Sequence, residues 1–319
     1  MSALFQQRLH FVVGKGGVGK TTVSAALARM LARSGRRTLA IEMDTGGRLP
    51  AALGAPPALE AAVAVEPRLS VLSVDGRSAL EEYLGILIPV KRLLSTVFAS
   101  RIYQYFVAAA PGLKELMTVG KVLYEVTREV DGRTAWDVVV VDAPATGHGL
   151  QYLRMPQAAR DTFGAGLVQR EAARIVDLMQ DPRTTAIHLV TLAEDMPVTE
   201  ALEAHVQLTG PLGLPLGSVV VNRMHTRRFD ERVVRALDEA ANGAGDDGPL
   251  LHAVADRAMQ ETSWAAINAH HLERLRDALP TRAVIELPYL FAEEFGGHEL
   301  DALAQRLGEA AAVRAARRA

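Results

Sequence analysis

Cysteine is missing from this 319-residue chain, so disulfide bonds, thiolate-held zinc, iron–sulfur clusters and cysteine nucleophiles are all excluded. Aromatic residues make up 5% of the chain, and the formal net charge is −2. A chain so close to neutral has no overall field that would attract nucleic acid or an anionic membrane. We therefore expect neither as a partner.

Long apolar runs are also missing. The most apolar short stretch, Leu84–Val90, ends at Lys91 and Arg92, and it is far below the roughly 20 residues that cross a bilayer. The first residues lack the charged, apolar and small-residue regions of a signal peptide. We expect a cytoplasmic protein without stable membrane insertion.

Glycine is concentrated near the N-terminus, where residues 14–22 read Gly-Lys-Gly-Gly-Val-Gly-Lys-Thr-Thr. This is the G-x-x-x-x-G-K-[ST] spacing of a phosphate-binding loop, lying between an apolar run and an Ala- and Leu-rich run. Bare glycines and a helix start expose backbone N–H groups that bind phosphate oxygens. The predicted ATP- or ADP-binding residues here are Gly14, Gly16, Gly17, Val18, Gly19, Lys20, Thr21 and Thr22.

Two residues of this loop and one distant aspartate predict a magnesium site. Lys20 is expected to reach the β and γ phosphates, and the Thr21 hydroxyl to ligate Mg²⁺. Asp142 ends the apolar run Asp137–Asp142, as a Walker B carboxylate does. We expect this carboxylate to take part in catalysis near Mg²⁺, through a water molecule.

Short apolar runs that alternate with helical stretches predict an α/β fold. Continuous rather than alternating apolar runs favour strands buried on both faces, as in a doubly wound, mostly parallel sheet. We expect one P-loop NTPase domain over residues 1–319, with helical insertions at about 77–133 and 151–183 forming a second subdomain. The candidate strands are residues 9–13, 37–43, 69–74, 137–142, 185–192, 218–222 and 283–287.

A second lysine, Lys15, follows the first glycine of the loop, and with it the motif resembles the variant Walker A loop of ATPases that include ArsA and MinD. Residues 142–148, Asp-Ala-Pro-Ala-Thr-Gly-His, are similar to the switch II segment of the ArsA-type family. The resemblance covers most of the chain and is nearest to bacterial relatives of the tail-anchored-protein targeting ATPase. It implies that Lys15 crosses a dimer interface to touch the partner's phosphates, as an arginine finger does.

The switch I segment departs from that family. The resemblance implies that Asp44 positions the attacking water, but the sequence continues Thr-Gly-Gly where the family has Pro-Ala. An aspartate here also suits an N-cap of the helix that follows Arg48. We keep Asp44 as a catalytic candidate and expect slow turnover or an altered role as an alternative.

Two further segments resemble the family's adenine site. Asn222 ends one candidate strand, and Pro288 and Tyr289 end another. An Asn amide both donates and accepts hydrogen bonds, which suits an adenine edge. In the same family a segment like residues 192–200 lies near the dimer interface, so Glu194 is a candidate contact with the partner.

The resemblance implies a dimeric, Mg²⁺-dependent ATPase that couples ATP hydrolysis to capture and release of a client. The apolar residues of 83–107 and 113–126 suit a groove for a hydrophobic, membrane-protein segment, or they pack on one another and on the sheet. Without cysteine, neither thiolate-bound arsenite nor a zinc-pinned dimer is expected, so the partner is a second copy or a paralogous chain. The alternatives are a MinD-like or ParA-like positioning ATPase, and a nucleotide-binding scaffold with little turnover in a heterodimer.

Overall fold

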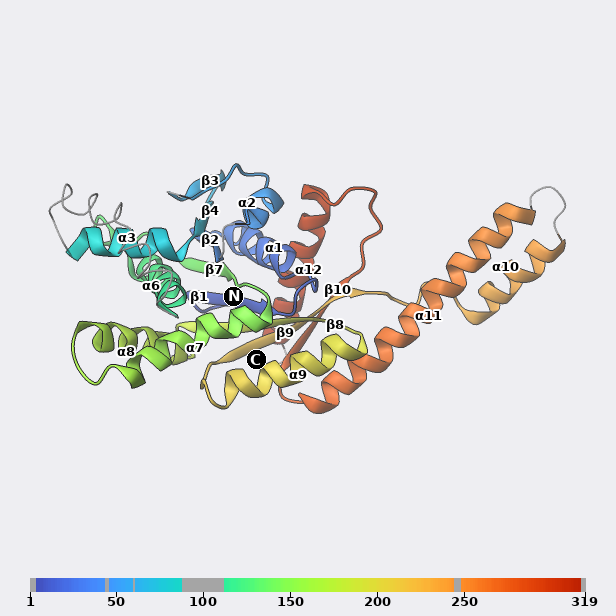
Figure 1. The fold of residues 1–319 in the computed structure, drawn as a ribbon. Helices are drawn as coiled ribbons and strands as arrows, with labels where there is room; N and C mark the ends of the chain where they lie inside the picture. Colours follow the sequence, from blue (N-terminus) through green and yellow to red (C-terminus); the bar gives the residue numbers. More distant parts are fainter. Residues whose placement is uncertain (1–3, 44–45, 60, 88–111, 244–247, 317–319) are drawn as a thin grey trace, which may run out of the picture.

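A computed structural model describes residues 4–43, 46–59, 61–87, 112–243 and 248–316 (Figure 1). Its centre is a sheet of eight described strands in the order β10-β9-β8-β1-β7-β2-β4-β3. All neighbouring pairs are parallel except β3 and β4. The strands are β1 (Leu9–Gly14), β2 (Thr38–Met43), β3 (Val63–Glu66), β4 (Leu69–Val74), β7 (Val138–Asp142), β8 (Thr185–Leu192), β9 (Leu216–Met224) and β10 (Ala283–Pro288); β5 (Glu129–Val130) and β6 (Arg133–Thr134) form a separate hairpin.

Helices cover both faces of the sheet, which confirms the doubly wound, mostly parallel α/β fold that the apolar runs predict. In β7, Val139 and Val141 join one buried cluster, whereas Val138 and Val140 join the other. This alternation explains why the run is apolar at every position, since each side chain enters one of two cores. The helices are α1 (Lys20–Arg33), α2 (Arg48–Ala52), α3 (Gly76–Leu87), α6 (Leu113–Thr127), α7 (Thr146–Thr162), α8 (Leu167–Gln180), α9 (Asp195–Thr209), α10 (Glu231–Gly243), α11 (Gly248–Ala278) and α12 (Gly297–Ala316).

The two predicted helical insertions hold α3 and α6, and most of α7 with α8. These helices contact one another in sequence, α3 with α6, α6 with α7 and α7 with α8. Figure 1 draws them as one group at the side of the sheet where β7 and β2 lie. Whether they form a separate subdomain stays a prediction. Most of the apolar stretch 83–107, and therefore most of the predicted client groove, lies outside the described residues.

A long helical hairpin, α10 and α11, projects away from the sheet on the other side (Figure 1). The C-terminal part of α11 is fixed in the core by Leu272 and Leu275, whereas Leu250 and Val254, nearer the tip, are exposed. The sequence reading did not anticipate this arm between β9 and β10. Across the described residues, no helix combines the length and the apolar character needed to cross a bilayer.

Candidate nucleotide site

The phosphate-binding loop joins the end of β1 to the start of α1, as its sequence predicts, and close packing explains two of its glycines. A Cβ on Gly14 would overlap the carbonyl oxygen of Val190 on the neighbouring strand β8. A Cβ on Gly19, whose φ is +90°, would overlap the amide nitrogen of Asn222. A side chain at either position would therefore push the loop away from the sheet.

Asn222 holds the loop in place from β9. Its Nδ2 donates a hydrogen bond to the carbonyl oxygen of Val18 at 2.9 Å, and both side chains are buried. Gly16 lies near Ala145, the N-cap residue of α7, because a Cβ built on Gly16 would be 3.6 Å from the Ala145 Cβ. Gly17 has a φ of +86° and open space around it, and Thr22 is half-buried in the first turn of α1. The eight predicted loop residues thus lie together from the end of β1 to the first turn of α1.

The Lys20 side chain is buried, and its ammonium donates to the carbonyl oxygen of Lys15 at 2.9 Å. Burial lowers the pKa of Lys20, an effect that the nearby Asp142 carboxylate opposes. An ammonium removed from water in this way gains strongly from an anionic ligand. The arrangement suits the predicted contact with phosphate oxygens.

Asp142 lies at the carboxyl end of β7, buried beside the first turn of α1. The Thr21 hydroxyl donates to its Oδ2 at 2.6 Å, and the Ser24 hydroxyl donates to its Oδ1 at 3.1 Å. Burial raises the Asp142 pKa to about 6, although both hydroxyls and the Lys20 charge act in the opposite direction. The sequence reading missed Ser24, which lies one helical turn after Thr21.

These oxygen donors fit Mg²⁺, which is held in nucleotide sites by one or two protein oxygens together with phosphates and water. Thr21 and Asp142 supply a hydroxyl and a carboxylate at hydrogen-bond distance from each other. Within the described residues, no group of three or more acidic, His or Cys side chains forms a metal cluster. A magnesium ion at Thr21 and Asp142 would take its remaining ligands from phosphates and water.

Lys15 pairs with Glu200, a glutamate on α9. Its Nζ lies 2.5 Å from Oε1 of Glu200, and the two side chains are 41% and 30% exposed. Glu194, the predicted partner contact, is the N-cap residue of the same helix. The catalytic role of Lys15 stays a prediction.

Asp44 lies outside the described residues, but the described residues that follow it exclude one alternative, that Asp44 is the N-cap of the next helix. The N-cap of α2 is Gly47, and the carboxylate of Glu42 accepts hydrogen bonds from the N–H groups of Gly47, Arg48 and Leu49 at 3.0, 2.8 and 3.3 Å. Glu42, buried at the end of β2, therefore caps this helix, so Asp44 is not the N-cap residue. The sequence reading missed Glu42 because it sits within an apolar strand.

The predicted adenine residues lie at neighbouring strand ends. Pro288 of β10 is in register with Met224 of β9, two residues after Asn222, and Tyr289 N–H donates to the Met224 carbonyl at 2.9 Å. The partly exposed Tyr289 ring stacks on the His225 ring, with centroids 4.5 Å apart. Contact of these residues with adenine stays a prediction.

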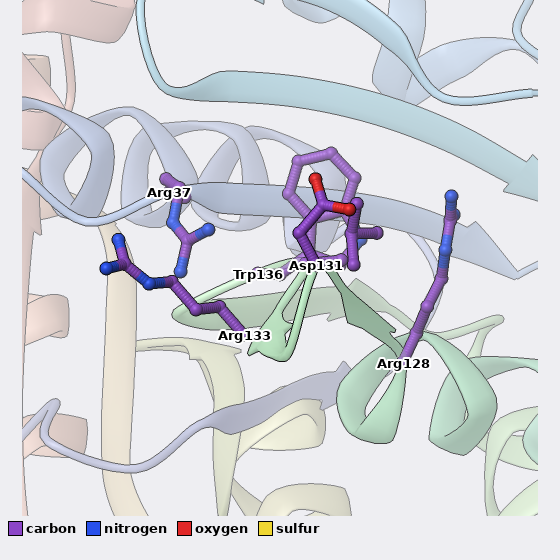
Figure 2. A pocket seen from close by; sticks show the side chains of 7 residues that line it. Arg37, Arg128, Asp131, Arg133 and Trp136 are labelled. Carbon is purple, nitrogen blue, oxygen red and sulfur yellow. The ribbon is translucent and has the colours of Figure 1, made fainter.

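A separate hollow of about 630 Å³ lies next to the β5–β6 hairpin (Figure 2). Its lining includes Arg37 and Arg128, which are paired with Asp137 at 2.6 Å and Glu125 at 3.2 Å. Arg37 and Asp137 precede β2 and β7, so this hollow is at the amino ends of the strands, opposite the phosphate-binding loop. Ligands of parallel sheets bind at the carboxyl ends, and these arginines are already neutralised, so the hollow is not the nucleotide site.

Comparison with known proteins places these features in a family. The sequence profile of the Anion-transporting ATPase (ArsA ATPase) family matches residues 7–170. The chain is 36% identical over 235 residues to the ATPase BagA of Mycobacterium tuberculosis, covering 70% of this chain and 66% of that protein. It is also 28% identical over 235 residues to the arsenical pump-driving ATPase of Escherichia coli, covering 66% of this chain and 38% of that protein.

The chain therefore belongs to the ArsA ATPase family, as the loop and switch motifs predict. It spans just under two thirds of the mycobacterial relative and much less of the Escherichia coli protein. The family membership accounts for the phosphate-binding loop, the buried strand-end aspartate and the parallel sheet between them.

Proposed function

We propose that this protein is a Mg²⁺-dependent ATPase, converting ATP and water to ADP and phosphate, that works as a dimeric switch. The observation that carries the proposal is the convergence of Lys20, Thr21 and Asp142 at the carboxyl ends of β1 and β7. A buried cation, a hydroxyl and a buried carboxylate are the groups that a magnesium triphosphate needs. Family membership supports the same reaction class.

The chain's own residues divide this work. Loop N–H groups and Lys20 would bind the β and γ phosphates, and Thr21 with Asp142 would hold the magnesium ion, which supplies charge neutralisation when bound. Asn222 keeps the loop against β9, so the N–H groups are oriented before nucleotide binds. Asp44 would orient the attacking water.

Lys15 would complete the site of a second subunit. Its side chain is 41% exposed, so its ammonium is accessible to a partner even while it is paired with Glu200. A cation supplied in trans stabilises charge on the transferred phosphoryl group and makes hydrolysis depend on dimer closure. The partner would be a second copy or a paralogous chain.

The client would be a hydrophobic segment captured by the apolar residues of 83–107 together with α3 and α6. Support for this part comes from the apolar composition of residues 83–107 and from the position of α6 next to both α3 and α7. Hydrolysis would reach these helices through the second switch segment, which leads from Asp142 directly into α7. The switch would thus join nucleotide state to client release.

The packing of α12 argues against one alternative, the MinD-like positioning ATPase. A MinD-like positioning ATPase needs an apolar helix face free for the membrane, but Leu300, Leu303 and Leu307 of α12 are buried in the core. A scaffold with little turnover remains the competing proposal because of the Thr-Gly-Gly sequence after Asp44.

Steady-state hydrolysis by the wild type and by Asp44→Asn tests the proposal against the scaffold. We expect clear magnesium-dependent hydrolysis by the wild type and a loss of at least tenfold in the variant. Equal rates near zero for both proteins, with nucleotide binding intact in calorimetry, would favour the scaffold. Lys15→Ala is expected to bind nucleotide but lose hydrolysis.

A further inference from the structure

The pairing of Lys15 with Glu200 joins parts of the chain that are 185 residues apart in sequence. One carboxylate oxygen of Glu200 lies 2.5 Å from the lysine ammonium. The other oxygen, Oε2, is buried and has no hydrogen-bond partner within the described residues. Lys15 is therefore the cation that compensates this partly desolvated carboxylate.

Glu200 cannot easily follow the lysine, because helix α9 is held on two sides. Val198 and Ala201 of α9 are buried in the core. On another side, Arg274 of α11 donates to Asp195 at 2.8 Å and to Thr199 at 2.9 Å. A lysine that moves toward another subunit must therefore leave Glu200 behind.

Lys15 is also in direct contact with Lys20, the second lysine of the loop. Its carbonyl oxygen accepts the hydrogen bond of the Lys20 ammonium at 2.9 Å, while its own ammonium is held by Glu200. A phosphate that attracts Lys20 removes this internal contact from the Lys15 backbone. We expect the Glu200 ion pair to be the remaining contact of these two when a phosphate draws the Lys20 ammonium away from the Lys15 carbonyl oxygen.

We propose that Glu200 is a positioning residue for Lys15, which keeps the ammonium within its own subunit until the phosphates of a partner replace the carboxylate. The inference rests on the proposed function, since it assumes that Lys15 acts across a dimer. A half-exposed ion pair changes an equilibrium by a factor of about five or less. A triphosphate carries several negative charges, so it outcompetes Glu200 only where a loaded partner is present.

The test is Glu200→Gln, which keeps the side-chain shape but removes its charge. Hydrolysis is measured against protein concentration at saturating ATP and magnesium, and dimerisation by sedimentation with a non-hydrolysable ATP analogue. Glu200→Gln leaves no ion pair for Lys15 to break, so the protein concentration for half-maximal hydrolysis should fall, by about fivefold or less. Glu203→Gln, an exposed carboxylate three residues further along α9, is the matched control and should change nothing.

A double variant separates positioning from a general structural effect. In the Lys15→Ala background, Glu200→Gln should leave dimerisation unchanged, because the residue that it positions is gone. The positioning role is overturned if Glu200→Gln weakens dimerisation, or if it gives the same shift with and without Lys15. Full hydrolysis by Lys15→Ala would instead overturn the proposed trans-lysine function itself, so the two failures are distinguishable.

Discussion

The hydroxyl of Thr21 donates a 2.6 Å hydrogen bond to the carboxylate of Asp142, which joins the first turn of α1 to the end of β7. This contact brings together the phosphate-binding loop and the strand-end acid, two segments that are 121 residues apart in sequence. The carboxylate is almost inaccessible to water, and its ionised form depends on neighbouring donors. Its protonation should therefore influence both magnesium binding and stability.

Nucleotide affinity should fall as the pH falls through about 6, where burial has raised the Asp142 pKa. A protonated Asp142 no longer attracts the magnesium ion, so the affinity for ATP with magnesium should drop about tenfold for each pH unit below this value. Calorimetric titrations between pH 7.5 and 5 measure it. Asp142→Asn should bind weakly and lose the pH dependence; an unchanged slope in this variant would contradict the assignment.

The same raised pKa predicts that Asp142→Asn stabilises the nucleotide-free protein. Because the folded-state pKa lies above the unfolded value of 3.8, the folded state binds the extra proton, and stability is lost as the pH rises from about 4 to 6. Above pH 6, removing the buried charge should raise the free energy of unfolding by up to about 3 kcal/mol, since burial raises the pKa from 3.8 to about 6. Denaturant unfolding at pH 7.5 with and without the substitution tests this, and a lower stability would contradict it.

Lys20→Ala should abolish measurable nucleotide binding. The substitution removes the buried ammonium that faces the loop and leaves Asp142 without its nearby cation. Calorimetry on the folded variant, with circular dichroism as the check on folding, measures the effect. Lys121→Ala is a suitable control, because this lysine pairs with Glu82 and Glu125 away from the loop. Binding equal to that of the wild type would remove the phosphate assignment.

Asn222→Ala should weaken nucleotide binding even if Asn222 does not touch adenine. Its amide donates to the Val18 carbonyl, so its loss leaves the loop less well oriented and a buried acceptor unpaired, at a cost of about 1–3 kcal/mol in stability. Comparison of ATP with GTP and inorganic triphosphate separates the two roles. An equal loss of affinity for all three ligands indicates that Asn222 orients the loop. A loss of affinity confined to ATP indicates that Asn222 recognises adenine.

A buried chain of hydrogen bonds predicts acid sensitivity of the fold. His10 Nε2 donates to the Gln7 carbonyl, so His188 Nε2 donates to His10 Nδ1 at 3.0 Å and Ser218 donates to His188 Nδ1 at 2.7 Å. Burial lowers the pKa of both histidines, that of His188 to about 3. In this series of hydrogen bonds both imidazole rings are neutral, and neither ring has a nitrogen free to accept another proton.

Because these folded-state values lie below 6.5, the unfolded state binds the extra protons, and stability should fall as the pH falls from about 6.5 toward 3. Within that window each histidine lowers the free energy of unfolding by about 1.4 kcal/mol for every pH unit of acidification. Denaturant unfolding at pH 7 and 5 measures it. His188→Gln should reduce the slope by about one proton.

Much of this architecture is predictable from sequence, because local signals and burial agree there. The apolar runs of β1, β4, β7 and β8 match the observed strands to within one residue at each end. The loop residues are recognisable because phosphate binding needs glycine, lysine and threonine at fixed spacing. β3 was missed because its four residues form a half-exposed antiparallel edge, which lacks the strong apolar signal of a central strand.

Contacts between distant segments were not predictable in the same way. The pairing of Lys15 with Glu200 depends on the angle at which α9 leaves β8, and no local pattern encodes it. The capping of α2 by Glu42 depends on the path of a loop, and Ser24 is an ordinary residue of a helix until Asp142 lies beside it. In the α10–α11 arm, α10 has a clear amphipathic pattern, but that pattern does not show that its apolar face packs on α11 rather than on the sheet. The pattern of α11 itself is weak.

The most direct test of the dimeric switch is a mixture of two inactive variants. Lys15→Ala binds nucleotide but lacks the trans lysine, and Lys20→Ala lacks nucleotide but keeps Lys15. If Lys15 acts across the subunit boundary, mixing them should restore a substantial fraction of wild-type hydrolysis at the sites of the Lys15→Ala subunits. No recovery in a mixture that sedimentation proves to contain mixed dimers, or a wild type that stays monomeric with ATP and magnesium, would contradict the account.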